Sequence, residues 1–342
     1  MVELTPRAAD APRPSGPTGE LIDGCGRRID HLRLSVTSRC DLRCCYCLPR
    51  GGHTRPRDPL LTDRQRVEFV AFLHERYGLS KVRITGGEPL VYRNTVALVS
   101  ALKRTVPKVE LAMTTNARLL YHHGFDLLRA GLDRVNVSLD SLDPVRYRRL
   151  TGGVLEPVLE GIRSALFLGF PPPRINTVVL RDLNDKEIVS LAEWALEQGL
   201  EIRFLEVMPI GPAAEHNRRH FVPAADIRSR LEERFDLTPL PREHGETASR
   251  FRARSRRTGR SGVVGVIAPV TEPFCGQCRR IRLTAEGRLY PCLLDSRFAD
   301  MRDAWKGGRF DPAVAADLLE RAVAGKAPQG GRQFVTMSTL GG

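Results

Sequence analysis

Short apolar runs alternate with longer amphipathic segments from about residue 31 to residue 206. The runs are rich in β-branched residues, as strands are, whereas the segments between them carry apolar residues at helical spacing. This pattern predicts strands over residues 31–36, 81–85, 109–114, 133–139, 174–180 and 201–206. It predicts helices over residues 62–77, 94–105, 121–130, 157–168 and 186–198.

Strands that alternate with helices are typical of a parallel sheet with crossover helices, so the sequence predicts the α/β class. A doubly wound sheet and an incomplete (β/α)6 barrel both fit this number of repeats. After about residue 235 the alternation stops. There we expect a solvated arginine-rich loop over residues 249–262, a β-run over 262–267, and a hairpin over 280–291 that turns at Glu286 and Gly287.

The predicted organisation has three parts: a flexible tail over residues 1–20, a β/α unit over residues 21–235 and a smaller module over residues 236–342. The chain has 342 residues, of which 42% are hydrophobic and 27% charged, a composition typical of a globular protein. Its longest clean apolar run, residues 263–270, is much shorter than the roughly 20 residues that span a bilayer. Because the N-terminal region also lacks the apolar stretch of a secretory signal, we expect a cytoplasmic protein with no membrane partner.

The formal net charge of +13 indicates an anionic partner. Nucleic acid, an anionic surface and a small polyanion such as a nucleotide are all compatible with it. Much of the excess is arginine, whose planar guanidinium suits phosphate oxygens. A solvated basic surface without a specific partner explains the charge equally well.

Six of the eight cysteines form two groups of three, separated by more than 220 residues. The first group is Cys40, Cys44 and Cys47, with three and two residues between them. Three thiolates on one loop can hold three irons of a [4Fe–4S] cluster and leave the fourth iron open to a chelating ligand. A zinc site or free buried thiols are the alternatives, but zinc normally takes four ligands in paired spacing.

The second group is Cys275, Cys278 and Cys292, again without an obvious fourth ligand. A structural zinc knuckle completed by a histidine is one explanation of this spacing. Two incomplete groups in one chain instead favour two [4Fe–4S] clusters, each with an open iron. The remaining cysteines, Cys25 and Cys45, have no assigned role, although Cys45 could compete with Cys44 as a ligand.

The first group, with Tyr46 before its last cysteine, resembles the signature of the radical S-adenosylmethionine (SAM) enzymes. The turn at Gly86 and Gly87, directly after the second predicted strand, is similar to the second motif of that superfamily. The resemblance implies an incomplete barrel, and it implies that SAM binds the open iron of the first cluster. One electron then cleaves SAM to a 5′-deoxyadenosyl radical that abstracts a substrate hydrogen.

Several cations fall on predicted strands or beside a cysteine group, where they could surround a triphosphate by bidentate contacts. Residues two apart on a strand share a face. The pairs Lys81 with Arg83 and Arg280 with Arg282 could therefore point into one cavity. For any single one of them, a solvated surface position is the more common role. The candidates are Arg33, Lys81, Arg83, Arg174, Arg203, Arg280 and Arg282.

The whole pattern from residue 24 onwards resembles the GTP 3′,8-cyclase family of molybdenum-cofactor biosynthesis. The resemblance is carried by residues 32–37, 83–89, 114–116, 135–140 and 202–208, by the second cysteine group with its arginines, and by the C-terminal pair of glycines. It implies a lyase that takes the C3′ hydrogen of GTP and joins C3′ to guanine C8, giving 3′,8-cyclo-7,8-dihydro-GTP. It also implies an external one-electron donor and a downstream cyclic pyranopterin monophosphate synthase.

The resemblance also implies roles for individual residues. One cluster would serve SAM, and the other would contact the guanine. The SAM site would include Tyr46, Gly86, Gly87, Ser138 and Met208. The resemblance adds Thr114 and Ile281 to the candidate cations as residues that contact GTP. It also implies that the terminal glycines, Gly341 and Gly342, assist catalysis. Position 174 is commonly lysine in this family, so arginine there changes reach and hydrogen-bond geometry.

Two other functions fit parts of the sequence. One is a different radical SAM enzyme with two clusters, such as one that modifies a peptide. The other is a zinc protein that binds nucleic acid through its basic surface. The cyclase resemblance favours a GTP substrate with no nucleic-acid partner, in a monomer or a homodimer; the sequence does not distinguish between these two states.

Overall fold

The computed structural model describes residues 19–47 and 60–329, so most of the expected N-terminal tail and the terminal glycine pair lie outside the described residues. A twelve-stranded sheet forms its centre, in the order β12-β11-β10-β1-β2-β3-β4-β5-β6-β9-β8-β7. The strands from β1 to β6 are parallel and adjacent in chain order. They are β1 (His31–Ser35), β2 (Lys81–Thr85), β3 (Glu110–Thr115), β4 (Arg134–Ser138), β5 (Arg174–Val179) and β6 (Glu201–Glu206).

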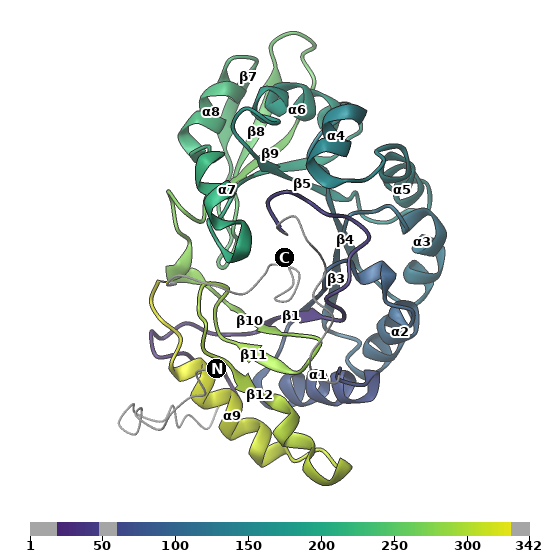
Figure 1. Cartoon of the computed structure of the whole chain (residues 1–342), viewed down its shortest axis with the longest axis vertical. Coiled ribbons are helices and arrows are strands. Elements are labelled where there is room, and N and C mark those ends of the chain that lie inside the picture. Colours follow the sequence, from purple (N-terminus) through teal and green to yellow (C-terminus); the bar gives the residue numbers. More distant parts are fainter. Residues whose placement is uncertain (1–18, 48–59, 330–342) are drawn as a thin grey trace.

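Helices cover the outer face of this curved sheet, and its inner face surrounds the interior of the molecule (Figure 1). This arrangement confirms the predicted α/β class and differs from a doubly wound sheet, which has helices on both faces and reverses its strand order. The helices of this part are α1 (Asp63–Tyr77), α2 (Thr95–Thr105), α3 (Leu120–Arg129), α4 (Pro144–Thr151), α5 (Glu156–Phe167) and α6 (Ile188–Glu197).

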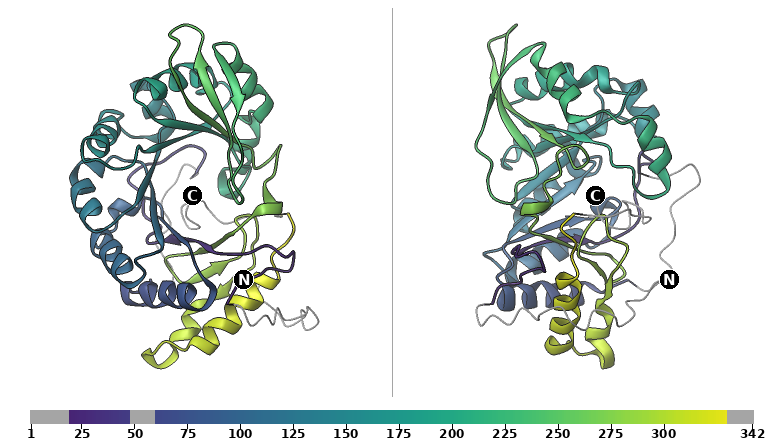
Figure 2. Two further views of the ribbon diagram at one scale, coloured as in Figure 1. Left: turned by 180° about the vertical axis from the view of Figure 1, so that it is seen from behind. Right: turned by 90° about the vertical axis from the view of Figure 1, so that its left-hand side faces the viewer.

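The C-terminal strands extend the same sheet at both edges. Strand β9 (Ser261–Ile267) lies parallel to β6, and β10 (Arg280–Leu283) lies parallel to β1 on the opposite side. The two sets of strands therefore approach the open side of the curved sheet from both edges (Figure 2). The expected hairpin at Gly287 is confirmed, because β10 pairs with β11 (Arg288–Tyr290) in antiparallel fashion. The division of the chain after residue 235 stays a prediction.

The remaining elements follow β6 and β10. They are α7 (Ala214–Arg219), α8 (Ala224–Glu232), β7 (Phe235–Pro239), β8 (Ser249–Ser255), β12 (Ala299–Asp300) and α9 (Pro312–Ala324), with 3-10 turns at Pro89–Val91, Asp185–Glu187, Gly211–Ala213, Cys275–Gln277 and Met301–Gly308.

The expectation of a solvated loop over residues 249–262 is wrong. Strand β8 occupies the first half of this segment and pairs with both β7 and β9. Its residues alternate: Ala253 and Ser255 are buried, whereas Arg252 and Arg254 are exposed. The segment therefore has the period of two of a half-buried strand, which its high arginine content obscures.

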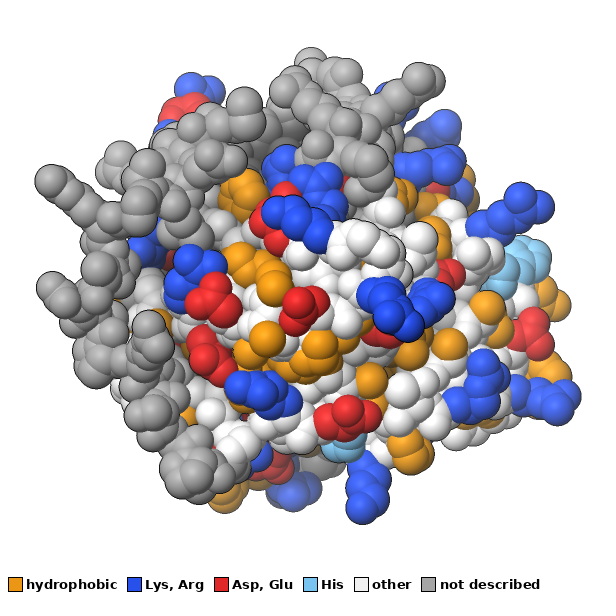
Figure 3. Space-filling view, turned by 90° about the horizontal axis from the view of Figure 1, so that it is seen from below, with side chains coloured by type: hydrophobic (Ala, Val, Ile, Leu, Met, Phe, Trp, Pro, Cys, Tyr) orange, Lys and Arg blue, Asp and Glu red, His pale blue; other side chains and the backbone are white. Residues whose placement is uncertain are grey.

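The surface shows where the positive charge lies. On the face seen in Figure 3, Lys and Arg side chains are interspersed with Asp and Glu side chains. Among the described residues, that face lacks the continuous basic stripe typical of a nucleic-acid site. In the described part of the chain, no helix has the length and apolarity needed to cross a membrane.

Candidate active site

A cavity of about 780 Å³ opens on the inner face of the sheet, within the size range of ligand-binding pockets. It collects nearly all predicted site residues that the structure describes. All six predicted cluster cysteines and all predicted SAM residues line it, as do Thr114 and every candidate cation. Ile281 is the exception, because its side chain is buried in the core behind β10. Gly341 and Gly342 lie outside the described residues.

The first cysteine loop is fixed by backbone hydrogen bonds to the end of α4. The N–H groups of Arg43 and Cys45 donate to the carbonyl groups of Thr151 and Leu150, at 2.8 and 2.9 Å. Cys45 packs against a small apolar cluster instead of lining the cavity, whereas Cys44 lines it. This arrangement favours Cys44 over Cys45 as the cluster ligand.

The glycine turn packs against the segment that leads into this loop. The N–H of Gly87 donates to the carbonyl of Thr37 at 2.7 Å, and a Cβ at Gly87 would lie 2.3 Å from the carbonyl oxygen of Arg39. A Cβ at Gly86 would lie 2.6 Å from the oxygen of Thr37. Glycine is therefore required here by a close approach of backbone to backbone, which brings the turn beside Cys40.

Glu88 joins the glycine turn to the end of β3. Its buried carboxylate accepts hydrogen bonds from the Thr115 hydroxyl at 2.6 Å and from the backbone N–H groups of Asn116 and Leu90, at 2.7 and 3.0 Å. Burial raises the pKa of Glu88 to about 7, against the opposing effect of these donors. The Asn116 side chain in turn donates to Asp41, next to Cys40, at 2.7 Å. This network positions the first cysteine loop, and the sequence analysis did not identify it.

Carboxylates surround the first cysteine group. The Tyr46 hydroxyl donates to Asp140 at 2.6 Å, and burial raises the pKa of Asp140 to about 6. Burial raises the pKa of the Cys40 thiol to about 12, with further contributions from Glu88 and Asp41. These thiols therefore need a bound cation to deprotonate them, as a metal centre does.

Cations surround the second cysteine group. Lys326 Nζ lies 3.4 Å and Arg280 Nη2 lies 3.6 Å from Cys278 Sγ. Although burial raises the pKa of Cys278, these two charges outweigh burial and lower it to about 6. The Arg27 guanidinium donates to the carbonyl groups of Cys275 and Ala327, at 2.8 and 2.9 Å, which ties the cysteine loop to the end of the described chain.

Each cysteine group has one sulfur that accepts a backbone hydrogen bond. Among the described residues, no three His, Cys, Asp or Glu side chains converge closely enough to hold one metal ion. A backbone N–H two residues beyond a cysteine donates to its sulfur in each group, from Leu42 to Cys40 and from Leu294 to Cys292, both at 3.4 Å. Hydrogen bonds to the ligand sulfurs are among the features that set the potential of an iron–sulfur cluster.

Three of the candidate arginines lack a carboxylate partner in the described part of the chain: Arg280, which lies beside Cys278, and the pair Arg33 and Arg83. Arg33 on β1 is in register with Arg83 on β2 and with Arg282 on β10, so three guanidinium groups occupy adjacent strands at one level. Burial, and then the charges of Arg282 and Arg280, lower the pKa of Arg33 well below its usual value. Burial and Arg33 have the same effect on the pKa of Arg83. Cations in this state are stabilised by a bound anion.

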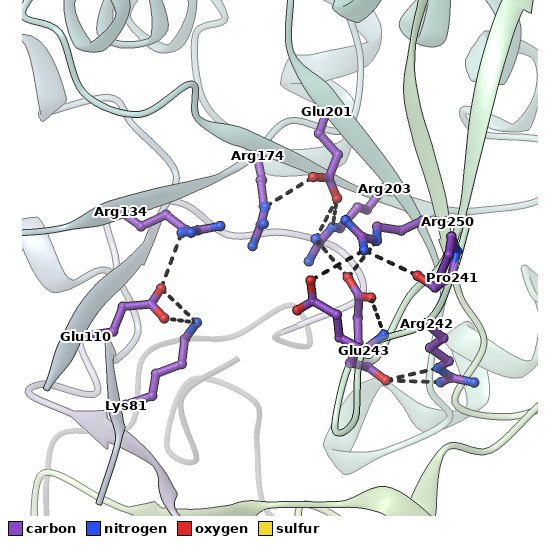
Figure 4. A network of polar contacts seen from close by, with 11 residues as sticks. Lys81, Glu110, Arg134, Arg174, Glu201, Arg203, Pro241, Arg242, Glu243 and Arg250 are labelled. Carbon is purple, nitrogen blue, oxygen red and sulfur yellow. Dashed lines mark hydrogen bonds and ion pairs between the residues drawn. The ribbon is translucent and has the colours of Figure 1, made fainter. Parts of the chain in front are cut away.

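Three further candidate cations are already neutralised by glutamates, as Figure 4 shows. Lys81 Nζ lies 2.9 Å from Glu110, and Glu201 bridges Arg174 and Arg203 at 3.2 and 2.5 Å. This places Lys81, Arg174 and Arg203 in the cavity wall, but within ion pairs. The sequence could not show this pairing, because it depends on the register between neighbouring strands.

Comparison with known proteins agrees with this geometry. The Radical SAM superfamily matches residues 34–195, and the family Molybdenum Cofactor Synthesis C matches residues 200–331. Among solved structures, Streptococcus suis SuiB bound to precursor peptide SuiA superposes with a TM-score of 0.61 at 14% identity, covering 89% of this chain and 75% of SuiB. The fold is thus that of the radical SAM class.

Two relatives narrow this class further. The GTP 3′,8-cyclase of Paenarthrobacter nicotinovorans is 40% identical over 315 residues, 89% of each chain. That of Moorella thermoacetica is 39% identical over 330 residues, 94% of this chain and 100% of the relative. The chain belongs to the GTP 3′,8-cyclase family.

Proposed function

We propose that this protein is a GTP 3′,8-cyclase that makes 3′,8-cyclo-7,8-dihydro-GTP in the first step of molybdenum-cofactor biosynthesis. Family membership supports the reaction. The row of Arg33, Arg83 and Arg282 is the single structural observation that supports the substrate most directly. Guanidinium groups at one level of the cavity wall, two of them without carboxylate partners in the described region, match a triphosphate in charge and hydrogen-bond geometry.

Two [4Fe–4S] clusters and SAM complete the proposed enzyme. Cys40, Cys44 and Cys47 would hold one cluster, and Cys275, Cys278 and Cys292 the other. With SAM bound and one electron from an external donor, the first cluster supplies the hydrogen-abstracting radical chemistry of the class. The predicted SAM residues Tyr46, Gly86, Gly87, Ser138 and Met208 would hold the cofactor at the first group.

The chain's own residues would then orient the substrate between the two groups. Arg33 and Arg83 would bind the phosphates, and Arg280 would hold the nucleotide beside Cys278. Thr114, on β3, lines the same cavity. Fixing both ends of GTP would place its C3′ hydrogen toward the SAM side, so that proximity contributes to the rate. The cavity walls would shield the reaction from water.

The family also supports the finer parts of the proposal. The enzyme would be a cytoplasmic lyase, acting as a monomer or a homodimer. Its product would pass to a cyclic pyranopterin monophosphate synthase. Gly341 and Gly342 would enter the site at the end of the chain and assist catalysis.

The test is a product assay under anaerobic conditions. Reconstituted, reduced protein is incubated with SAM and GTP, and with SAM and ATP as the control. We expect 5′-deoxyadenosine and a cyclised guanine nucleotide in equal amounts, with little of either in the ATP reaction. Formation of 5′-deoxyadenosine that does not depend on GTP would contradict the proposal.

A further inference from the structure

Asn217 connects two loops that are far apart in the sequence and close in the cavity wall. It lies in the short helix α7, and its side chain is only 2% exposed. Its amide Nδ2 donates to the backbone carbonyl of Tyr46 at 3.1 Å and to that of Met208 at 2.9 Å. Tyr46 belongs to the first cysteine loop, whereas Met208 belongs to the loop after β6. Asn217 therefore sets the spacing of these two loops.

The orientation of this amide follows from its partners. Both are carbonyl oxygens, which only accept, so the NH2 end of the Asn217 side chain must face them. Its Oδ1 is buried and has no hydrogen-bond partner in the described part of the chain, while Asn217 itself lines the cavity. An unsatisfied buried acceptor destabilises the unliganded protein, so it points to a ligand that donates a hydrogen bond.

A second asparagine provides an internal comparison. Asn184 is equally buried, and its Nδ2 also donates to two backbone carbonyl groups, those of Asp140 and Val178, at 2.8 and 2.9 Å. Its Oδ1, however, accepts a hydrogen bond from the N–H of Leu180 at 2.7 Å. Asn184 does not line the cavity. Each of the two side chains thus donates to two backbone carbonyl groups, but of the two only Asn217 has an Oδ1 without a hydrogen-bond partner.

The surroundings of Asn217 restrict the ligand group. Tyr46, Val178 and Val207 line the cavity here and belong to a small apolar cluster that is separate from the main core. The unpaired arginines lie on β1 and β2, far from this cluster in the strand order. An apolar wall with one uncharged acceptor fits a flat heteroaromatic ring that carries an N–H donor. It does not fit a phosphate group, whose oxygens would face the acceptor.

We propose that Asn217 selects the adenine ring of SAM, because its Oδ1 accepts a hydrogen bond from the exocyclic amino group. That amino group is the only N–H donor on an adenine ring. The same side chain acts as a positioning residue, since it holds the Tyr46 and Met208 loops on either side of the ring. This assignment rests on the proposed function to the extent that SAM is the cofactor.

The experiment compares SAM with its 6-oxo analogue, S-inosylmethionine, in which a carbonyl group replaces the amino group. Dissociation constants are measured by anaerobic calorimetry on the cluster-loaded protein. Wild-type protein should bind SAM more tightly by about tenfold or more, because the analogue places an acceptor against Oδ1. Asn217→Leu should weaken SAM binding and reduce this preference to about twofold or less.

Asn184→Leu is the matched control. It removes the same pair of donors together with a satisfied acceptor, so it should lower the melting temperature but leave the preference for SAM unchanged. Equal affinity of wild-type protein for the two ligands, or a full preference retained by Asn217→Leu, would overturn the assignment. Absence of any SAM binding by wild-type protein would overturn the proposed function as well.

Discussion

Arg33 on β1 lies directly opposite Arg83 on β2, and both side chains line the cavity without a carboxylate partner among the described residues. Two like charges on neighbouring strands repel each other, and burial adds the loss of hydration. Around them, Lys81, Arg174 and Arg203 are paired with glutamates. The cavity therefore contains two electrostatically different sets of cations, and only the unpaired set has its charge available for an anion.

The first prediction compares these two sets through Arg83→Met and Arg203→Met. Arg83→Met should raise the dissociation constant for GTP by about 10- to 100-fold, since charge-assisted hydrogen bonds contribute about 1.5–3 kcal/mol. It should not lower the melting temperature of the unliganded protein, because no partner loses its charge. Arg203→Met should lower that temperature, because it removes the Arg203 ion pairs and leaves Glu201 with Arg174 alone and Glu246 with Arg250 alone. Calorimetry measures the GTP affinity, and thermal unfolding measures the stability. A larger loss of GTP affinity in Arg203→Met than in Arg83→Met would contradict the assignment of the unpaired arginines to GTP.

The second prediction concerns pH and Glu88. Burial raises the pKa of this carboxyl from 4.5 to about 7 in the folded protein. Its contribution to stability is therefore fully present below the ordinary value and is lost as the pH rises through about 7. Glu88→Gln should flatten the fall in the free energy of unfolding between about pH 5 and pH 7, while lowering stability at pH 5. Urea unfolding across this range tests it, and a slope identical to that of wild-type protein would refute the role of Glu88.

Local signals were sufficient for most of the β/α unit. The bounds of β2 and β6 agree with the predicted strands, and the other four parallel strands differ by about one residue at an end. The pattern missed α4, which spans eight residues and buries few apolar side chains. It also missed α7, whose six residues are too short for a helical period to be visible. Tertiary contacts, more than local propensity, define such short helices.

The site residues were predictable from local patterns and from the family resemblance, whereas the contacts that join distant segments of the chain were not. The cysteine spacing and the glycine turn are local patterns, so the sequence analysis identified them. Lys326 lies 48 residues from Cys278, and Asn217 lies 171 residues from Tyr46. No local pattern marks either contact. The pairing of Lys81 with Glu110 likewise depends on the register between β2 and β3.

The third prediction concerns Asn136, a buried residue on β4 between Thr114 and Arg174 in register. Both polar atoms of its side chain are buried and lack a hydrogen-bond partner in the described part of the chain. Each such atom costs about 1–3 kcal/mol. Asn136→Leu, of similar volume, should therefore raise the free energy of unfolding of the unliganded protein by at least about 1 kcal/mol. Chemical denaturation measures this change, and a lower stability would show that the amide has a structural partner.

The fourth prediction concerns the terminal glycines, which lie outside the described residues. Deletion of Gly341 and Gly342 should reduce turnover strongly, while iron and sulfide content and GTP affinity stay close to those of wild-type protein. This combination follows if the pair assists catalysis without holding either cluster. Addition of two glycines after Gly342 is the matched control for chain length. A deletion variant with wild-type turnover would remove the pair from the proposed mechanism.

The fifth prediction separates the two proposed clusters by their electrostatic surroundings. The buried Lys326 ammonium lies 3.4 Å from Cys278 Sγ, whereas carboxylates surround the first group. A nearby positive charge stabilises the reduced, more negative form of a cluster. Lys326→Met should therefore lower the midpoint potential of the second cluster by about 50–100 mV, which corresponds to about 1–2 kcal/mol for one electron.

The first cluster should keep its potential in this variant, because Lys326 contacts Cys278 and Arg280 and is not among the charges that shift the pKa of Cys40 or Cys44. A redox titration followed by electron paramagnetic resonance resolves the two signals. Lys306→Met is the control, since this lysine is exposed and paired with Asp303 at 3.2 Å. An unchanged second potential in Lys326→Met would mean that Arg280 alone sets the charge at Cys278, and a shift of both potentials would mean that the variant disturbs the cavity as a whole.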